Sequence, residues 1–117
     1  MLPKRIIIDT DPGVDDALAL LLALASPEIR LEALSTTQGN VTVERATRNA
    51  LSILELCNAS YIPVAKGSIV PLVQPLQASA YVHGESGIGN SQLPEPTTTR
   101  VQTCRGLPDR LCPCQPE

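Results

Sequence analysis

A short apolar strand that runs into a row of carboxylates constrains this chain more than any other feature. The run Ile6-Ile7-Ile8 places three β-branched residues in succession, which is typical of a strand buried on both faces inside a parallel sheet. Four acids, Asp9, Asp11, Asp15 and Asp16, follow within eight positions. Asp9 and Asp11 are two residues apart, so an extended chain directs them to the same side.

The acids fall where the predicted strand gives way to a helix. Pro12-Gly13 break the strand, so Asp15 and Asp16 come at the start of the helix that follows. Acidic side chains stabilise a helix N-terminus, but carboxylates this close together repel one another. A cation bound by oxygen ligands relieves that repulsion, and Ca²⁺ or Mg²⁺ suits carboxylates better than Zn²⁺ does. We therefore expect a hard divalent cation at this turn.

Strands and helices alternate along the first half of the chain. The hydrophobic patterns predict strands over 5–9, 31–36 and 62–65 and helices over 14–25 and 43–57, the second with Thr42 as its N-cap. This order favours an α/β fold with an open parallel sheet and right-handed crossovers, in which strand 5–9 is internal. Helix 14–25 is apolar all round, so we expect it to be covered on both sides. Ligands bind such sheets beyond the carboxyl ends of the strands.

The last third of the chain lacks regular periodicity. Residues 68–99 contain frequent Pro and Gly and one His, and a loop of this length in a compact domain is usually functional or disordered. We predict one domain over 1–100 and an aberrant or disordered tail over 101–117. Cys104, Cys112 and Cys114 lie in that tail without the spacing of a metal site, whereas Cys57 is expected to pack as a small hydrophobe.

Charge and hydropathy exclude several classes of protein. The net charge is −3 and no basic cluster is present, which argues against nucleic acid binding. The apolar run Ala17–Ala25 is too short to span a bilayer, and Met1–Arg5 is too short and polar for a signal peptide. We expect a soluble, cytoplasmic protein with no membrane partner.

Four motifs resemble those of the nucleoside hydrolases, the inosine/uridine-preferring nucleoside N-ribohydrolase family. In chain order they are Asp9–Ala17, Ser35–Asn40, Thr47–Ala50 and Val82–Gly89. The resemblance covers about residues 4 to 96 and implies the family's Rossmann-like fold, truncated here after about three strands. It also implies hydrolysis of the N-glycosidic bond of a ribonucleoside to ribose and free base, and full-length relatives that form homo-oligomers.

The resemblance assigns roles to five side chains. It implies that Asp11 and Asp16 are Ca²⁺ ligands and that Asp11 is also the general base that deprotonates the attacking water. It implies that Asp15 and Asn40 bind the ribose and that His83 lies close to the substrate as a catalytic residue.

Plainer interpretations of the same residues stay open. The acids can form a solvated turn, Asn40 can serve as a turn residue and His83 can be a surface side chain. Asp9 has no defined role in the resemblance beyond support for the neighbouring acids. A phosphoryl-transfer enzyme of the haloacid dehalogenase type also has Asp-x-Asp after a strand, but Pro12-Gly13 depart from that pattern.

The second alternative is a non-catalytic truncated fragment or splice product. The family's proteins are longer, and their later metal-binding Asp and neighbouring His have no counterpart here. Because Ca²⁺ takes six to eight oxygen ligands, we expect weak calcium binding and impaired hydrolysis from this chain. The sequence does not indicate which nucleoside is preferred.

Overall fold

The computed structural model describes residues 1–69, 73, 75, 77, 80–89, 91–98 and 101–103. Its elements in chain order are β1 (Lys4–Thr10), α1 (Val14–Ala25), β2 (Ile29–Thr36), α2 (Val43–Leu56), β3 (Val64–Lys66), α3 (Ala80–His83) and β4 (Val101–Thr103). No helix among these residues is long and apolar enough to cross a membrane.

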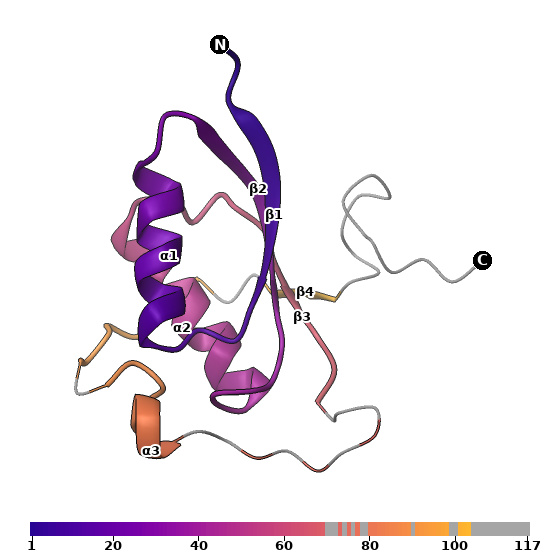
Figure 1. The fold of residues 1–117 in the computed structure, drawn as a ribbon, viewed down its shortest axis with the longest axis vertical. Coiled ribbons are helices and arrows are strands. Elements are labelled where there is room, and N and C mark those ends of the chain that lie inside the picture. The colour runs from indigo at the N-terminus through magenta and orange to yellow at the C-terminus, as the bar shows by residue number, and fades with distance from the viewer. Residues whose placement is uncertain are drawn as a thin grey trace.

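The strands form one parallel sheet in the order β1-β2-β3-β4. Both long helices lie on the same side of this sheet in Figure 1. The core between them is aliphatic, with Leu20 from α1, Leu34 from β2, and Ile53 and Leu54 from α2. The predicted parallel α/β architecture is therefore confirmed.

Strand β1 is an edge strand in this sheet, so the prediction of an internal position is wrong. Within the described residues β1 pairs with β2 alone. Ile6 and Ile8 are half-buried, while Ile7 keeps 38% of its surface exposed. The helices cover the Ile6 and Ile8 side only, which is why a run of three β-branched residues does not become buried on both faces.

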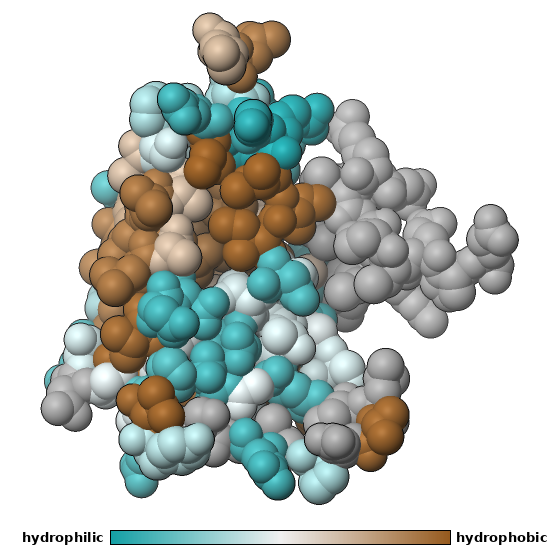
Figure 2. All heavy atoms as spheres, in the orientation of Figure 1, coloured by the Kyte–Doolittle hydropathy of each residue, from teal (hydrophilic) through white to brown (hydrophobic). Residues whose placement is uncertain are grey.

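Helix α1 is buried along one side, which corrects the expectation of cover all round. Ala17, Leu20 and Ala23 are buried, and α1 packs against β2 and α2. Three leucines, which we call the leucine patch, stay exposed: Leu18 at 64%, Leu21 at 42% and Leu22 at 71%. Figure 2 shows the resulting hydrophobic surface over α1 and toward β1.

Helix α2 begins and packs as its sequence predicts. The Thr42 hydroxyl accepts a hydrogen bond from the Arg45 N–H at 3.4 Å, which confirms Thr42 as the N-cap. Its apolar residues Ala46, Ala50, Ile53 and Leu54 are buried on one face. Cys57 is a free thiol that is partly buried against the core.

A register shift in the β1–β2 pair aligns the ends of the two strands. Ile6 pairs with Leu31 and Ile7 with Ala33, so Glu32 is the extra residue. The Glu32 carboxylate lies 3.0 Å from Arg5 and 2.8 Å from Arg30. As a result Asp9 pairs with Ser35 and Thr10 with Thr36, and both strands end at the same level.

Strand β4 falls where the sequence shows no strand pattern. Val101–Thr103 pair in parallel with Val64–Lys66, so the described sheet has four strands rather than about three. The predicted tail cysteines Cys104, Cys112 and Cys114 lie outside the described residues.

Candidate active site

The acid turn, Asp11 to Asp16, lies at the carboxyl end of β1. Thr37 N–H donates to Thr10 O at 3.0 Å and continues the β1–β2 pairing to the edge of the turn. Gly13 is the N-cap of α1. The Asp16 carboxylate reaches back and accepts the Gly13 N–H at 3.2 Å, so this acid is fixed by the helix start that it stabilises.

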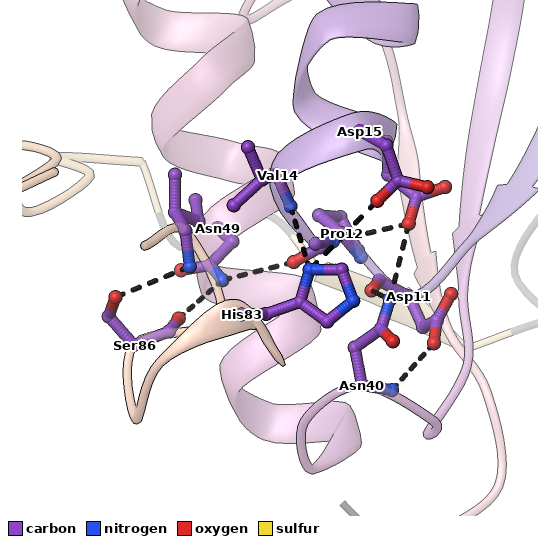
Figure 3. A network of polar contacts seen from close by, with 11 residues as sticks. Asp11, Pro12, Val14, Asp15, Asn40, Asn49, His83 and Ser86 are labelled. Carbon is purple, nitrogen blue, oxygen red and sulfur yellow. Dashed lines mark hydrogen bonds and ion pairs between the residues drawn. The ribbon is translucent and has the colours of Figure 1, made fainter. Parts of the chain in front are cut away.

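Asn40 joins the two acids of this turn that were predicted to bind metal. Its backbone N–H donates to Asp11 Oδ2 at 2.6 Å. Its side-chain Nδ2 donates to the Asp11 carbonyl at 3.2 Å and to Asp16 Oδ2 at 3.4 Å (Figure 3). The ends of β1 and β2 thus bring Asp11, Asp16 and Asn40 together, although 29 positions separate Asp11 from Asn40.

Two glycines permit this close approach. A Cβ at Gly39 would stand 2.1 Å from Asp11 Oδ2, and one at Gly13 would stand 2.8 Å from both Asn40 Nδ2 and His83 Nδ1. Neither position accepts a side chain unless the site opens. The sequence predicts only that Pro12-Gly13 break the strand, and it gives no sign of the steric role of either glycine.

His83 reaches the acid turn from the end of α3. Its Nδ1 accepts the Val14 N–H at 3.3 Å and lies 4.0 Å from Asp15 Oδ1. An Nδ1 that accepts a hydrogen bond carries no proton, so the neutral ring holds its proton on Nε2 and the Asp15 contact is not a hydrogen bond. The His83 side chain is 14% exposed, whereas that of Asp15 is 83% exposed.

Asp9 is separate from this network. Its carboxylate accepts a hydrogen bond from Ser35 Oγ at 2.6 Å, and the residue is exposed. Of the four acids in the motif, hydrogen bonds therefore connect Asp11 with Asp16 through Asn40 and leave Asp9 outside.

The possible metal ligands at the turn are oxygen atoms, which suit a hard cation, but they are few. Asp11 and Asp16 offer carboxylate oxygens, and two buried acceptors nearby in sequence, Thr10 Oγ1 and Gln38 Oε1, have no hydrogen-bond partner among the described residues. Such an all-oxygen set is what Ca²⁺ prefers. Within the same residues, however, no three His, Cys, Asp or Glu side chains cluster as a metal site.

Asn49 is a site residue to which sequence reasoning gave no role. It lies on α2, is 7% exposed, and donates through Nδ2 to Ser86 O at 2.9 Å and to Pro12 O at 3.4 Å. One sequence pattern could have singled out Asn49. It follows Ala46 by three residues and precedes Ile53 by four, so its polar side chain lies on the apolar face of the helix.

Comparison with known proteins shows the family to which the chain belongs. Residues 6–111 match the model of the inosine-uridine preferring nucleoside hydrolase family. The chain belongs to this family. The match extends beyond residue 96, where the resemblance noted from the sequence ends.

Relatives and solved structures share the N-terminal part of the hydrolases. The non-specific ribonucleoside hydrolase RihC of Klebsiella pneumoniae (strain 342) is 54% identical over 83 residues, which are 71% of this chain and 27% of that protein. RihC of Salmonella paratyphi A is 53% identical over 84 residues, again 27% of its length. The chain therefore spans about a quarter of the curated relatives it matches.

The structural neighbours are nucleoside hydrolases with the Rossmann-like fold, as predicted. The purine-preferring ribonucleoside hydrolase from Gardnerella vaginalis superimposes with a TM-score of 0.75 at 38% identity, covering 81% of this chain and 31% of that one. The plant nucleoside hydrolase PpNRh1 gives a TM-score of 0.71 at 44% identity, with 82% and 32% covered.

Proposed function

We propose that this chain carries the acid-bearing, ribose-facing part of a ribonucleoside hydrolase, which cleaves the N-glycosidic bond to give ribose and free base. The observation that supports this most directly is the link that Asn40 makes between Asp11 and Asp16 at the carboxyl end of β1. Family membership supplies the class of reaction.

Asp11 is proposed as the general base. Its Oδ2 is engaged by the Asn40 N–H, while Oδ1 has no hydrogen-bond partner among the described residues. One oxygen is thus held in place and the other can take a proton from an attacking water. A carboxylate fixed in this way needs little reorganisation when the proton is transferred.

Asp15 and Asn40 are proposed to hold the ribose. The Asp15 side chain is open to solvent. The Asn40 Nδ2 donates to Asp11 and Asp16, and Oδ1 has no partner among the described residues. Both side chains therefore have oxygens that can accept hydrogen bonds from sugar hydroxyls.

Ca²⁺ is proposed to bind at Asp11 and Asp16. A bound cation would lower the pKa of a coordinated water and orient the sugar. Two carboxylates are fewer than the six to eight oxygens that Ca²⁺ takes, so further oxygen donors have to complete its shell.

His83 is proposed to contact the nucleoside through Nε2–H, since Nδ1 is engaged by the Val14 N–H. A cytoplasmic location and assembly into homo-oligomers, which the resemblance implies, stay predictions.

A chimaera tests the reaction. Residues 1–96 are joined to the remaining part of the RihC relative, and ribose release from inosine and uridine is measured with Ca²⁺ present. We expect turnover, and we expect Asp11→Ala to lower kcat/KM by about 10³-fold or more, because the base and a metal ligand are lost together.

Asp9→Asn is the matched control in the same chimaera. Its carboxylate binds Ser35 and lies outside the Asp11–Asn40–Asp16 network, so we expect an effect of less than about tenfold. If Asp9→Asn abolishes turnover while Asp11→Ala does not, Asp9 is the reacting group and the hydrolase assignment of Asp11 is wrong. The 117-residue chain alone, assayed in parallel, tests the expectation of impaired activity.

A further inference from the structure

Asn49 connects three segments that meet at the candidate site. The residue belongs to α2, and its Nδ2 donates to Pro12 O in the acid turn and to Ser86 O in the loop 84–89. Both acceptors are 37 positions away in sequence, on opposite sides. At 7% exposure the amide is shielded from water, so each of these bonds replaces a solvent contact that is no longer available.

The loop that Asn49 holds follows directly after His83, the last residue of α3. The loop is closed on itself, because Gly89 N–H donates to His83 O at 2.6 Å and Gly87 N–H donates to Gly84 O at 3.0 Å. The Ser86 hydroxyl adds a bond of 3.0 Å to Gly89 O. These bonds connect His83 with the rest of the loop, so a tether at Ser86 also restrains His83.

Gly87 lets the loop lie directly against Asn49. Its φ is +82°, and a Cβ there would stand 2.7 Å from Val41 Cγ1 and 3.3 Å from Asn49 Nδ2. A left-handed conformation and this contact both require glycine. Beside it Ile88 is 8% exposed and belongs to the core cluster, so the loop has an apolar anchor as well as the amide tether.

We propose that Asn49 is a positioning residue of this site, whose side-chain amide holds the loop 84–89 against the acid turn and so keeps the His83 ring on the Val14 N–H. Figure 3 shows Asn49 joined to the Pro12 carbonyl, with the His83 ring close to Pro12. The consequence for catalysis rests on the proposed nucleoside hydrolase function, whereas the coupling itself rests on the contacts above.

The coupling can be measured in the 117-residue chain because His83 is its single histidine. NMR signals of the imidazole therefore need no separation from others. Val14 lies in the first turn of α1, where an N–H has no partner within the helix. Its exchange with solvent thus reports directly whether His83 is in place.

The test compares Asn49→Asp with Ser52→Ala. Asn49→Asp keeps the size of the side chain but turns a carboxylate oxygen toward the Pro12 and Ser86 carbonyls. Ser52 lies on the same helix at 2% exposure and donates to Pro94 O at 2.9 Å, away from the acid turn. We expect Asn49→Asp to speed exchange of the Val14 amide by about tenfold and to move the His83 ring signals. Ser52→Ala should leave both unchanged.

Unaltered Val14 and His83 signals in a folded Asn49→Asp chain would overturn the proposal, because Ile88 would then hold the loop unaided. The same holds if Ser52→Ala gives the same change. If Asn49→Asp does not fold, the wild-type chain decides: nuclear Overhauser effects from the Asn49 side-chain NH₂ to Ser86 and Gly87 are expected, and their absence contradicts the tether.

Inosine titration of the same spectra separates this proposal from the proposed function. In the wild-type chain, inosine should shift the Asn40 and His83 signals, and the shifts give an apparent affinity. An affinity about tenfold weaker in Asn49→Asp supports a role in substrate positioning. Wild-type spectra that do not respond to inosine count against substrate binding by this chain, and the Val14 exchange still decides the coupling.

Discussion

The residues around Asp11 are packed so closely that an added side chain would displace its carboxylate. Asp11 meets the Asn40 N–H at 2.6 Å, and Gly39 lies so close that any side chain there meets the same carboxylate. Hydrogen bonds to a charged acceptor contribute about 1.5 to 3 kcal/mol each. The position of the Asp11 carboxylate thus depends on Gly39, which has no side chain.

We expect Gly39→Ala to disrupt the Asp11 site. The new Cβ would stand 2.1 Å from Asp11 Oδ2 and force the loop and the carboxylate apart. The Asn40 amide proton should move upfield, and the Ca²⁺ concentration at half-saturation should rise by about tenfold or more. Both are read from one NMR titration. Thr37→Ala in the same loop is the control, since it removes only a 3.4 Å bond to Gln38 O. Calcium binding as tight as in the wild type would contradict this expectation.

The sequence could locate the acids and Asn40 but not what holds them. Asp11, Asp16 and Asn40 follow predicted strands, and strand ends meet at one edge of a parallel sheet. The tether by Asn49 depends on a loop 37 positions later in the chain. The clash at Gly39 depends on the rotamer of Asp11. Neither is a property of a local pattern.

The two long helices, α1 and α2, differ in how many of their residues are buried. Helix α2 buries nine of its residues, whereas α1 buries three. Pro12-Gly13, Ser26-Pro27 and Thr42 are local signals for helix ends, so α1 was predicted at its observed bounds and α2 to within one residue. The extent of burial and the three-residue strand β4 depend on what packs alongside, so local patterns could not supply them.

Two leucines on α1 should differ sharply in their contribution to stability. Leu20 is 1% exposed in the core, so Leu20→Ala should lower the free energy of unfolding by about 2 to 5 kcal/mol. Leu22 is 71% exposed, so Leu22→Ala should change it by no more than about 0.5 kcal/mol. Urea unfolding followed by circular dichroism measures both. Equal losses would mean that the exposed face of α1 is buried in solution.

We expect the segment 94–98 to detach from α2 at low pH. The Glu55 carboxylate accepts the Thr97 hydroxyl and the Thr97 N–H, each at 2.8 Å. These bonds hold the pKa of Glu55 below its ordinary value of 4.5. Because the folded pKa is the lower one, the stabilisation is present above about 4.5 and is lost as the pH falls through the lowered value.

The amide signal of Thr97 followed against pH tests this point. Its shift should change in the acidic range in the wild type and stay nearly constant in Glu55→Gln, which cannot ionise. A wild-type profile that is flat down to the acid-unfolded state would show that Glu55 does not hold the segment.

For the whole molecule, a sheet with an open edge and a helix with an exposed apolar side is a source of association. Strand β1 lies at the edge, and the leucine patch adds apolar surface on α1. Unpaired strand edges and contiguous apolar patches both promote contacts between chains. A net charge of −3 opposes such contacts only weakly.

We expect the chain to associate as its concentration rises, and the double substitution Leu18→Glu with Leu22→Lys to reduce this. Both residues are exposed, so the exchange should leave the fold intact. Sedimentation velocity over a hundredfold range of concentration measures the effect. Tyr81→Ser is the control, because Tyr81 is 90% exposed on α3 and outside the leucine patch. A wild-type chain that stays monomeric throughout would contradict the expectation.

The separation of 69 positions between Val14 and His83 has a consequence for the order in which the molecule matures. A ribosome adds about 5 to 20 residues per second, so the acid turn is made roughly 3 to 14 seconds before its histidine. The rest of α1, then β2 and α2, are made during that interval, so both sides of the acid turn are in the chain before His83 is. The contact between His83 and the acid turn therefore forms late in chain growth, when the loop after α3 docks onto helices that are already made.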